Sequence, residues 1–187
     1  MDNGLIPARY AKALYKYALE KHVAVGIYDA MGNLDRSFTS VLGQKLKESL
    51  SNPSVKDPTK RELIMAAAGF HGQATKESDV LNDFITLLIK NNRISELRGI
   101  VNAYGSLYRK ENKIRQVHVT WASEPDKENE ERLKSMIQQK LGESPMEYSS
   151  SINPSLIGGF KVAIDNEQLD ASVENELRQL RQKLLSK

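Results

Sequence analysis

Apolar residues in the first 110 positions recur every three or four residues, which is the spacing of amphipathic helices. Pro7 suits the first turn of a helix, because the N–H group that proline lacks would have no helical partner there. The apolar positions of this first helix are Ile6, Tyr10, Ala13, Leu14, Tyr17 and Ala18. Gly26 predicts a break, and residues 27–50 are expected to form a second helical stretch that ends before Pro53.

Three further helices are predicted in this region. Thr59 is expected to cap the first of them, with Glu62 three residues later as its capping-box partner. The second starts at Ser78 or Asp79 and stops at the Asn pair that follows Lys90. The third has its inward residues at Leu97, Ile100, Val101, Tyr104 and Leu107. Antiparallel helices with short connections make a small bundle, which is the expected architecture here.

The pattern changes near residue 113, where alternation with a period of two replaces the helical spacing. Strands are expected at 116–122, 145–152 and 160–165. Residues 126–141 predict an amphipathic helix, and residues 171–185 predict a final one, with Asp170 or Ser172 as its N-cap. The Asn-Glu pair at 166–167 predicts a tight turn. The carboxy-terminal part is therefore expected to be a small α+β domain.

Charge follows the same division into two domains, residues 1–112 and residues 113–187. Basic residues outnumber acidic ones 17 to 12 up to position 113, and acidic residues outnumber basic ones 12 to 10 after it. The net charge is +3 and the pI is about 9.0. Two domains of opposite charge are compatible with two different partners. A basic helical module that binds nucleic acid is the alternative, although such proteins normally concentrate their basic residues in one stripe.

The sequence has no recognisable catalytic constellation. It contains no Cys, which excludes disulfides, thiolate metal sites and thiol nucleophiles. Its three histidines, His22, His71 and His118, are far apart and lack a metal-ligand spacing. No cofactor or metal is therefore expected, and an enzyme on an α+β fold would need a titratable cluster in a pocket. No apolar run approaches the roughly 20 residues that span a bilayer, so any membrane association is expected to be indirect.

Two helices have apolar faces wider than the ~100° stripe that faces a single core. The apolar residues between Val80 and Ile89 cover roughly half of their helix, and the first helix shows a similar broadening. Either both helices are central in the bundle, or they border a groove that accepts a partner's amphipathic helix. The candidate groove residues are Tyr10, Ala11, Leu14, Ala18, Phe84, Ile85 and Leu88. On the groove hypothesis, Leu14→Asp or Leu88→Asp is expected to weaken partner binding and to leave the bundle folded.

Three stretches are distinctive in their order and spacing. They are 7–14 (PARYAKAL), 84–94 (FITLLIKNNRI) and 153–160 (NPSLIGGF), with 170–173 (DASV) after the last. Together they resemble the delta subunit of bacterial F-type ATP synthases, whose mitochondrial counterpart is the oligomycin-sensitivity-conferring protein. The resemblance covers nearly the whole chain.

This resemblance implies an amino-terminal six-helix bundle and a smaller carboxy-terminal α/β domain. The bundle would bind amino-terminal segments of the alpha subunits of the catalytic head, in a groove between its first and fifth helices. The second domain would bind the b subunits of the peripheral stalk. The implied function is that of a non-catalytic stator subunit, which resists rotor torque during proton-driven ATP synthesis. Its implied location is the cytoplasmic face of the bacterial inner membrane, as a peripheral protein that binds no nucleic acid.

Two details of the third stretch lead to separate expectations. Gly158 and Gly159 are expected to form a turn whose backbone geometry requires glycine, rather than a contact with a partner. Ala171 stands where members of the family often have glycine. Because alanine is the better helix former, a firmer helix start is expected there.

Overall fold

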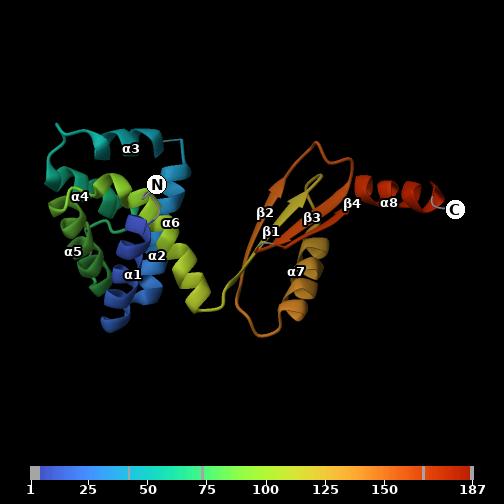
Figure 1. The fold of residues 1–187 in the computed structure, drawn as a ribbon, viewed down its shortest axis with the longest axis horizontal. Helices are drawn as coiled ribbons and strands as arrows, with labels where there is room; N and C mark the ends of the chain where they lie inside the picture. Colours follow the sequence, from blue (N-terminus) through green and yellow to red (C-terminus); the bar gives the residue numbers. More distant parts are fainter. Residues whose placement is uncertain (1–4, 42, 73, 166, 186–187) are drawn as a thin grey trace. The chain divides into compact units, whose positions relative to one another are not determined.

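Two units make up the chain, one helical and one built on a β-sheet (Figure 1). The computed structural model describes residues 5–41, 43–72, 74–165 and 167–185. The helical unit is Met1–Lys110 and the sheet unit is Glu111–Lys187. The structure thus contains both α-helices and a small sheet, and the predicted mixed α+β class is confirmed.

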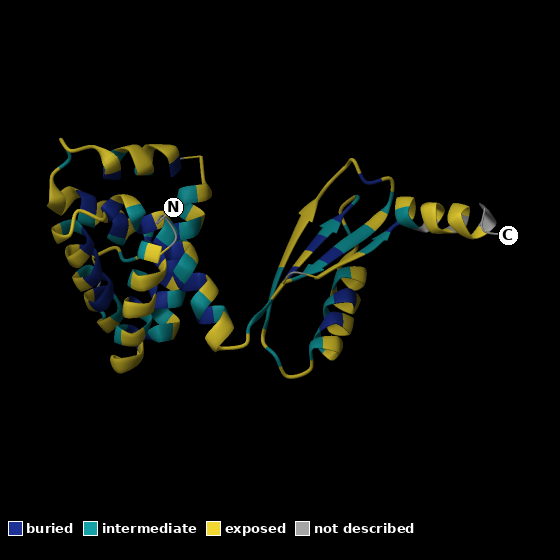
Figure 2. Ribbon diagram, in the orientation of Figure 1, coloured by how far each residue is buried: buried dark blue, intermediate teal, exposed yellow. Residues whose placement is uncertain are grey.

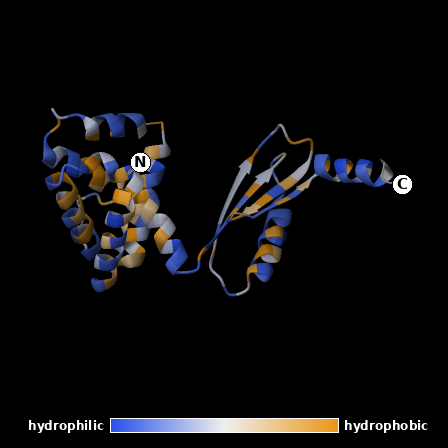
Figure 3. Cartoon of the chain, in the orientation of Figure 1, coloured by the Kyte–Doolittle hydropathy of each residue, from blue (hydrophilic) through white to orange (hydrophobic). Residues whose placement is uncertain are grey.

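The helical unit contains helices joined by short connections. Their bounds are α1 Leu5–Glu20, α2 Ala24–Thr39, α3 Gly43–Ser51, α4 Asp57–Ala67, α5 Lys76–Lys90, the 3-10 helix η1 Ile94–Glu96 and α6 Leu97–Glu111. Figure 3 shows that α3 is mostly hydrophilic, and only two of its residues, Gly43 and Leu50, are buried. The core therefore lies mainly among the other helices.

The predicted break at Gly26 is wrong, because α1 ends earlier. His22 takes the left-handed conformation at φ +59°, and the Val23 N–H bonds back to the Ala18 carbonyl at 2.9 Å. A hydrogen bond from an N–H just past the helix to the carbonyl five residues earlier is a common way to end a helix. Gly26 instead lies in the first turn of α2, where an added Cβ would be 2.5 Å from the Glu77 side chain. Residues 27–50 are likewise not one stretch, since α2 ends at Thr39.

The predicted caps of α4 and α5 are wrong as well. Helix α4 begins at Asp57 with a proline in its first turn, so Thr59 lies inside the helix. In α5 the N-cap is Thr75, whose hydroxyl accepts the Ser78 N–H at 3.1 Å, while the Ser78 hydroxyl accepts the Thr75 N–H at 2.9 Å. Ser78 is therefore the third helical residue of a reciprocal capping box. The predicted end of this helix at Lys90 is confirmed.

The core of the helical unit is made mainly of aliphatic residues, with Phe84, Tyr104 and Tyr108 as buried aromatic residues; Figure 2 shows the buried positions on the facing sides of the helices. Burying a Leu or Ile side chain of this kind contributes about 1.5–3 kcal/mol to folding. In α6 the prediction is confirmed for four residues, but Leu107 is only partly buried and Tyr108 takes an inward position instead. Fully buried side chains include Leu14, Ile27, Leu34, Ile64, Leu81, Ile85, Leu88, Ile100 and Tyr104.

The sheet unit has four strands in the order β2-β1-β3-β4. Their bounds are β1 Arg115–Trp121, β2 Met146–Ile152, β3 Gly159–Ile164 and β4 Glu167–Ser172, with α7 Lys127–Leu141 and α8 Val173–Leu185. Strand β1 pairs in parallel with β2 and antiparallel with β3. Helix α7 connects the two parallel strands and packs on one sheet face. The core of this face is Val117, Val119, Trp121, Leu133, Ile137 and Val162.

Strand β4 was not predicted, and it corrects the expected start of the last helix. Ala171 lies in this strand opposite Phe160, so it does not strengthen a helix start. Helix α8 begins at Val173, and the Asn175 N–H bonds to the Ser172 hydroxyl at 3.4 Å, as expected for Ser172 as N-cap. The predicted tight turn involves Asn166, which lies outside the described residues.

Asp170 organises the junction between β4 and α8 and makes this junction sensitive to acid. Hydrogen bonds from the Ser172 hydroxyl and N–H, and then the Lys161 ammonium at 3.1 Å, lower the pKa of Asp170 from 3.8 to about 2. Because the folded-state pKa is depressed, the stabilising contribution is complete above about pH 4 and is lost as the pH falls towards 2.

We therefore expect the sheet unit to lose stability to urea between pH 4 and pH 2, and we expect Asp170→Asn to reduce that dependence. The measurement is the unfolding midpoint, followed by fluorescence of the single Trp121 in the sheet unit. Equal pH dependence in the parent and the variant would show that Asp170 does not carry this effect.

Candidate protein-binding site

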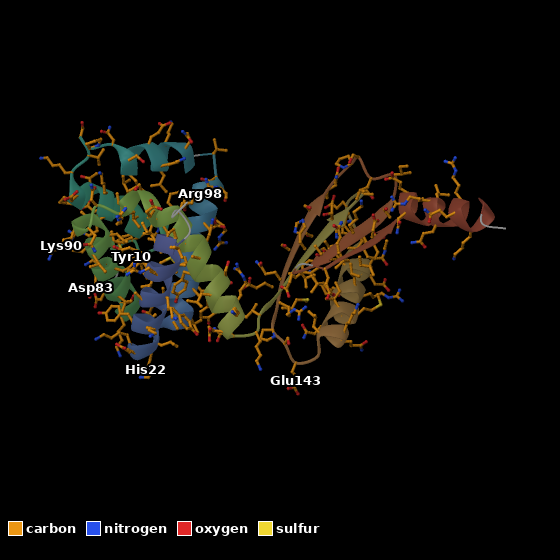
Figure 4. All side chains as sticks on the ribbon, viewed as in Figure 1. Tyr10, His22, Asp83, Lys90, Arg98 and Glu143 are labelled. Carbon is orange, nitrogen blue, oxygen red and sulfur yellow. The ribbon has the colours of Figure 1, made fainter. Side chains whose placement is uncertain are left out.

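Helices α1 and α5 lie side by side, and their boundary carries the candidate site (Figure 4). The Tyr17 hydroxyl donates to the Asp83 carboxylate at 3.1 Å, and the Asn91 amide donates to the Tyr10 hydroxyl at 3.4 Å. Between these bonds the rings of Tyr10 and Phe84 meet edge to face, with their centroids 6.4 Å apart. Low numbers on α1 meet high numbers on α5, so the two helices run antiparallel. We call this boundary the α1–α5 seam.

Most of the predicted groove residues lie in the interior of the bundle. The buried ones, each no more than 5% exposed, are Ala11, Leu14, Ala18, Phe84, Ile85 and Leu88. Tyr10 is partly exposed. Helix α5 contacts α1, α2, α4 and η1, so a central position in the bundle accounts for its wide apolar face. A binding role for these residues stays a prediction.

A hollow of about 410 Å³ opens on the seam beside these buried residues. Leu87 on its wall is 44% exposed, which leaves an apolar side chain available to a partner. Among the predicted residues, Tyr10 lines the hollow. The other residues that line the hollow were not among the predicted groove residues. Ile6 and Ala13 could have been found, because they follow the same helical spacing as Tyr10. The lining residues are Ile6, Arg9, Tyr10, Ala13, Leu87 and Arg93.

The two ends of the seam differ in charge. Arg9 and Arg93 line the hollow at one end. At the other end, the hydrogen bond to Asp83 raises the pKa of the Tyr17 phenol, and burial and the negative charges of Asp83, Glu20 and Asp79 act in the same direction. These carboxylates are thus close enough to Tyr17 to affect its titration.

The sheet unit exposes a different apolar surface, at β4 and α8. Leu169 on β4 is 57% exposed, and Val173 and Leu177 on the first turns of α8 are 38% and 56% exposed. Helix α8 contacts β4. We call Leu169, Val173 and Leu177 the β4–α8 surface. Exposed apolar side chains on an amphipathic helix can bind a helix of another protein.

Gly158 and Gly159 lie at the start of β3, close to Ala171 and Val173. Gly159 has φ +78°, and an added Cβ would lie 2.4 Å from the Ala171 carbonyl oxygen. Gly158 approaches Val173, whose side chain would be 3.0 Å from an added Cβ. The pair thus lets β3 pass close to the end of β4, which is a backbone requirement of the kind that glycine meets.

The histidines are placed separately in the structure. His118 lies on the exposed face of β1, with one ring nitrogen 2.9 Å from the Ser149 hydroxyl and the other 2.9 Å from the Ser151 hydroxyl. His22 follows α1, and His71 follows α4. Within the described ranges, no group of three or more His, Asp and Glu is arranged to hold a metal ion. The helices in these ranges also lack the combination of length and apolar composition that a bilayer span requires.

The chain is thus a two-unit α+β protein, in which the helical unit carries a hollow on the α1–α5 seam and the sheet unit carries a separate exposed apolar surface. The model of the ATP synthase delta (OSCP) subunit family matches residues 6–184. The chain belongs to this family, and the resemblance found in its sequence is confirmed.

Individual relatives agree with this assignment over the full length of the chain. The "ATP synthase subunit delta" of Parabacteroides distasonis is 37% identical and covers 99% of this chain and 98% of its own. The protein of the same name from Bacteroides thetaiotaomicron is 36% identical and covers 100% and 97%. In the cryo-EM structure of the Toxoplasma gondii mitochondrial ATP synthase hexamer, one chain is 18% identical with a TM-score of 0.69, covering 96% of this chain and 97% of that chain. That likeness shows a shared fold.

Proposed function

We propose that this chain is a non-catalytic stator subunit of an F-type ATP synthase. It joins the catalytic head to the peripheral stalk and resists the torque of the rotor during proton-driven ATP synthesis. Membership in the delta (OSCP) family supports this role. So does the presence of one separate candidate surface on each of the two units. The complex would hold the chain at the cytoplasmic face of a bacterial inner membrane.

The helical unit is the proposed end for the catalytic head. Helices α1 to α6 would form the six-helix bundle that the family resemblance implies, and residues 1–112 would be its domain. The hollow on the α1–α5 seam is the single observation that carries this assignment. It combines an exposed Leu87 with the ring of Tyr10, and it would accept an apolar side chain from an amino-terminal helix of an alpha subunit.

The sheet unit is the proposed end for the b subunits of the peripheral stalk, with residues 113–187 as its domain. Its β4–α8 surface leaves three apolar side chains exposed. Val173 and Leu177 are four residues apart on α8, so both lie on one side of the helix.

A pull-down with separate alpha and b subunits tests both ends. We expect Leu87→Asp to weaken capture of the alpha subunit about tenfold or more and to spare the b subunit, because it places a charge in an apolar contact. We expect Leu177→Asp to have the opposite selectivity. Both leucines are at least 44% exposed, so both variants should fold.

The controls are Leu63→Asp on α4 and Met136→Asp on α7, which change apolar residues of similar exposure outside the two surfaces. They should bind both subunits like the parent. Capture of the alpha subunit by Leu87→Asp at the parental level would show that the hollow is not the binding site. Failure of the parent to capture either subunit would refute the stator role.

A further inference from the structure

The α1–α5 seam has two chemically different ends, about 16 Å apart along α1 from Arg9 to Glu20 at 1.5 Å per residue. Arg9 and Arg93 are both exposed and border the hollow at the first end. Lys90, also exposed, is in the last turn of α5 and adds to the positive charge there (Figure 4). An apolar anchor inserted beside Leu87 would therefore have two guanidinium groups next to it.

The second end carries carboxylates. Asp83 accepts the Tyr17 hydroxyl, and Glu20 and Asp79 are near enough to influence the same phenol. All three acids are exposed. One cation, Lys21, lies 5.7 Å from the centre of the Tyr17 ring, and exposed Lys16 is one position before Tyr17 on α1. With three carboxylates and two cations, this end is less positive than the first end. At the first end, the only charged residues that line the hollow are the two arginines.

An α-helix is itself polar, with partial positive charge at its amino terminus and partial negative charge at its carboxyl terminus. Side-chain charges often reinforce this dipole. A helix laid on the seam is stabilised when its amino-terminal end lies over Asp83 and its carboxyl-terminal end, or a carboxylate next to its apolar anchor, lies at Arg9 and Arg93. The opposite orientation brings like charges together at both ends.

We propose that this charge difference fixes the direction in which an amphipathic partner helix docks on the seam, with its carboxyl-terminal end at Arg9 and Arg93 and its amino-terminal end at Asp83. The inference rests on the proposed binding of an alpha-subunit segment to the same seam. The inference adds the direction in which that segment runs. It also predicts an acidic residue next to the apolar side chain of the segment that enters the hollow. Complementary charges of this kind contribute more to orientation and specificity than to raw affinity.

The direction can be read by NMR with the full-length chain, labelled with ¹⁵N. The probe is a synthetic peptide of the alpha-subunit amino-terminal segment, with a nitroxide spin label at one end or at the other. We expect a label at the peptide's carboxyl terminus to broaden the amide signals of Asn91 and Arg93. A label at its amino terminus should broaden those of Glu20 and Asp79.

The reverse pattern, or equal broadening at both ends with both labels, overturns the proposed direction while leaving the proposed function intact. Absence of binding by the unlabelled peptide would refute the proposed function itself. The two failures are therefore distinguishable.

A charge reversal provides a second test. We expect Arg9→Glu combined with Arg93→Glu to weaken the peptide about tenfold at low salt, and the difference should shrink at high salt. The control is Lys12→Glu combined with Lys127→Glu, which changes the net charge equally at exposed positions that do not line the hollow. Equal loss of affinity in both double variants would mean that only net charge matters, and it would overturn the inference.

Discussion

Leu88→Asp is expected to unfold the helical unit rather than to weaken partner binding alone. The Leu88 side chain has no exposed surface, so the substitution buries a carboxylate among apolar neighbours and removes a core contact. We expect a loss of about 4 kcal/mol or more in the free energy of unfolding, which is at the high end for single substitutions. The measurement is urea denaturation followed by circular dichroism at a helical wavelength.

Leu87→Asp is the matched control, because it places the same residue on the neighbouring position of α5, where the side chain is 44% exposed. It should change the free energy of unfolding by less than about 1 kcal/mol, as is usual for surface positions. Similar unfolding curves for the two variants would contradict the placement of Leu88 in the core. This expectation replaces the one drawn from the sequence, in which Leu88→Asp left the bundle folded.

Gly159→Ala is expected to have the second large effect, on the sheet unit. An alanine there must adopt a left-handed conformation, and its Cβ would come 2.4 Å from the Ala171 carbonyl oxygen. The conformation alone costs roughly 1–2 kcal/mol, and relieving the clash requires the paired ends of β3 and β4 to move apart. The measurement is the unfolding midpoint of the sheet unit, followed by Trp121 fluorescence.

Gly142→Ala separates the two contributions. Gly142 also has a positive φ, at +67°, but an added Cβ would meet nothing within 4 Å. At φ +67° and ψ −132° the Gly142 backbone is one that glycine adopts far more readily than alanine, so this variant measures a conformational cost without a steric contact. A larger loss in Gly159→Ala would show that the approach of Ala171 adds to that cost.

Regular periodicity explains which parts of the fold were predictable. The helix that ends at Lys90 and the strand beginning near residue 116 have strong apolar repeats, and the end of the helix and the position of the strand were predicted correctly. Strand β4, with the sequence EQLDAS, has few of the β-branched and aromatic residues that favour strands, and it forms by pairing with β3. Gly26 was wrongly predicted to break a helix. Its small size instead leaves room for the Glu77 side chain, which comes from a distant segment of the chain.

The candidate site was predictable only in its location. The wide apolar faces drew attention to α1 and α5, and the structure shows that these two helices are in contact; a binding role for their boundary stays a prediction. Periodicity does not tell which part of a wide face is covered by neighbouring helices, and so it selected buried residues such as Leu14. Arg9 and Arg93 are 84 positions apart in the chain, and only the fold brings them to one hollow.

The pairing order of the sheet has a consequence for how the chain acquires its structure. Strand β1 is the first strand along the chain and pairs on both sides with strands that come much later. Arg115 is opposite Met146, and Val117 is opposite Ile164. Such pairings across long intervening segments form slowly, whereas the local contacts of helices form quickly. During synthesis the helical unit can therefore fold while β1 still lacks both partners. Until β3 has been synthesised, both edges of β1 are open to pairing with wrong strands. The chain is therefore most prone to aggregation while the sheet unit is still incomplete.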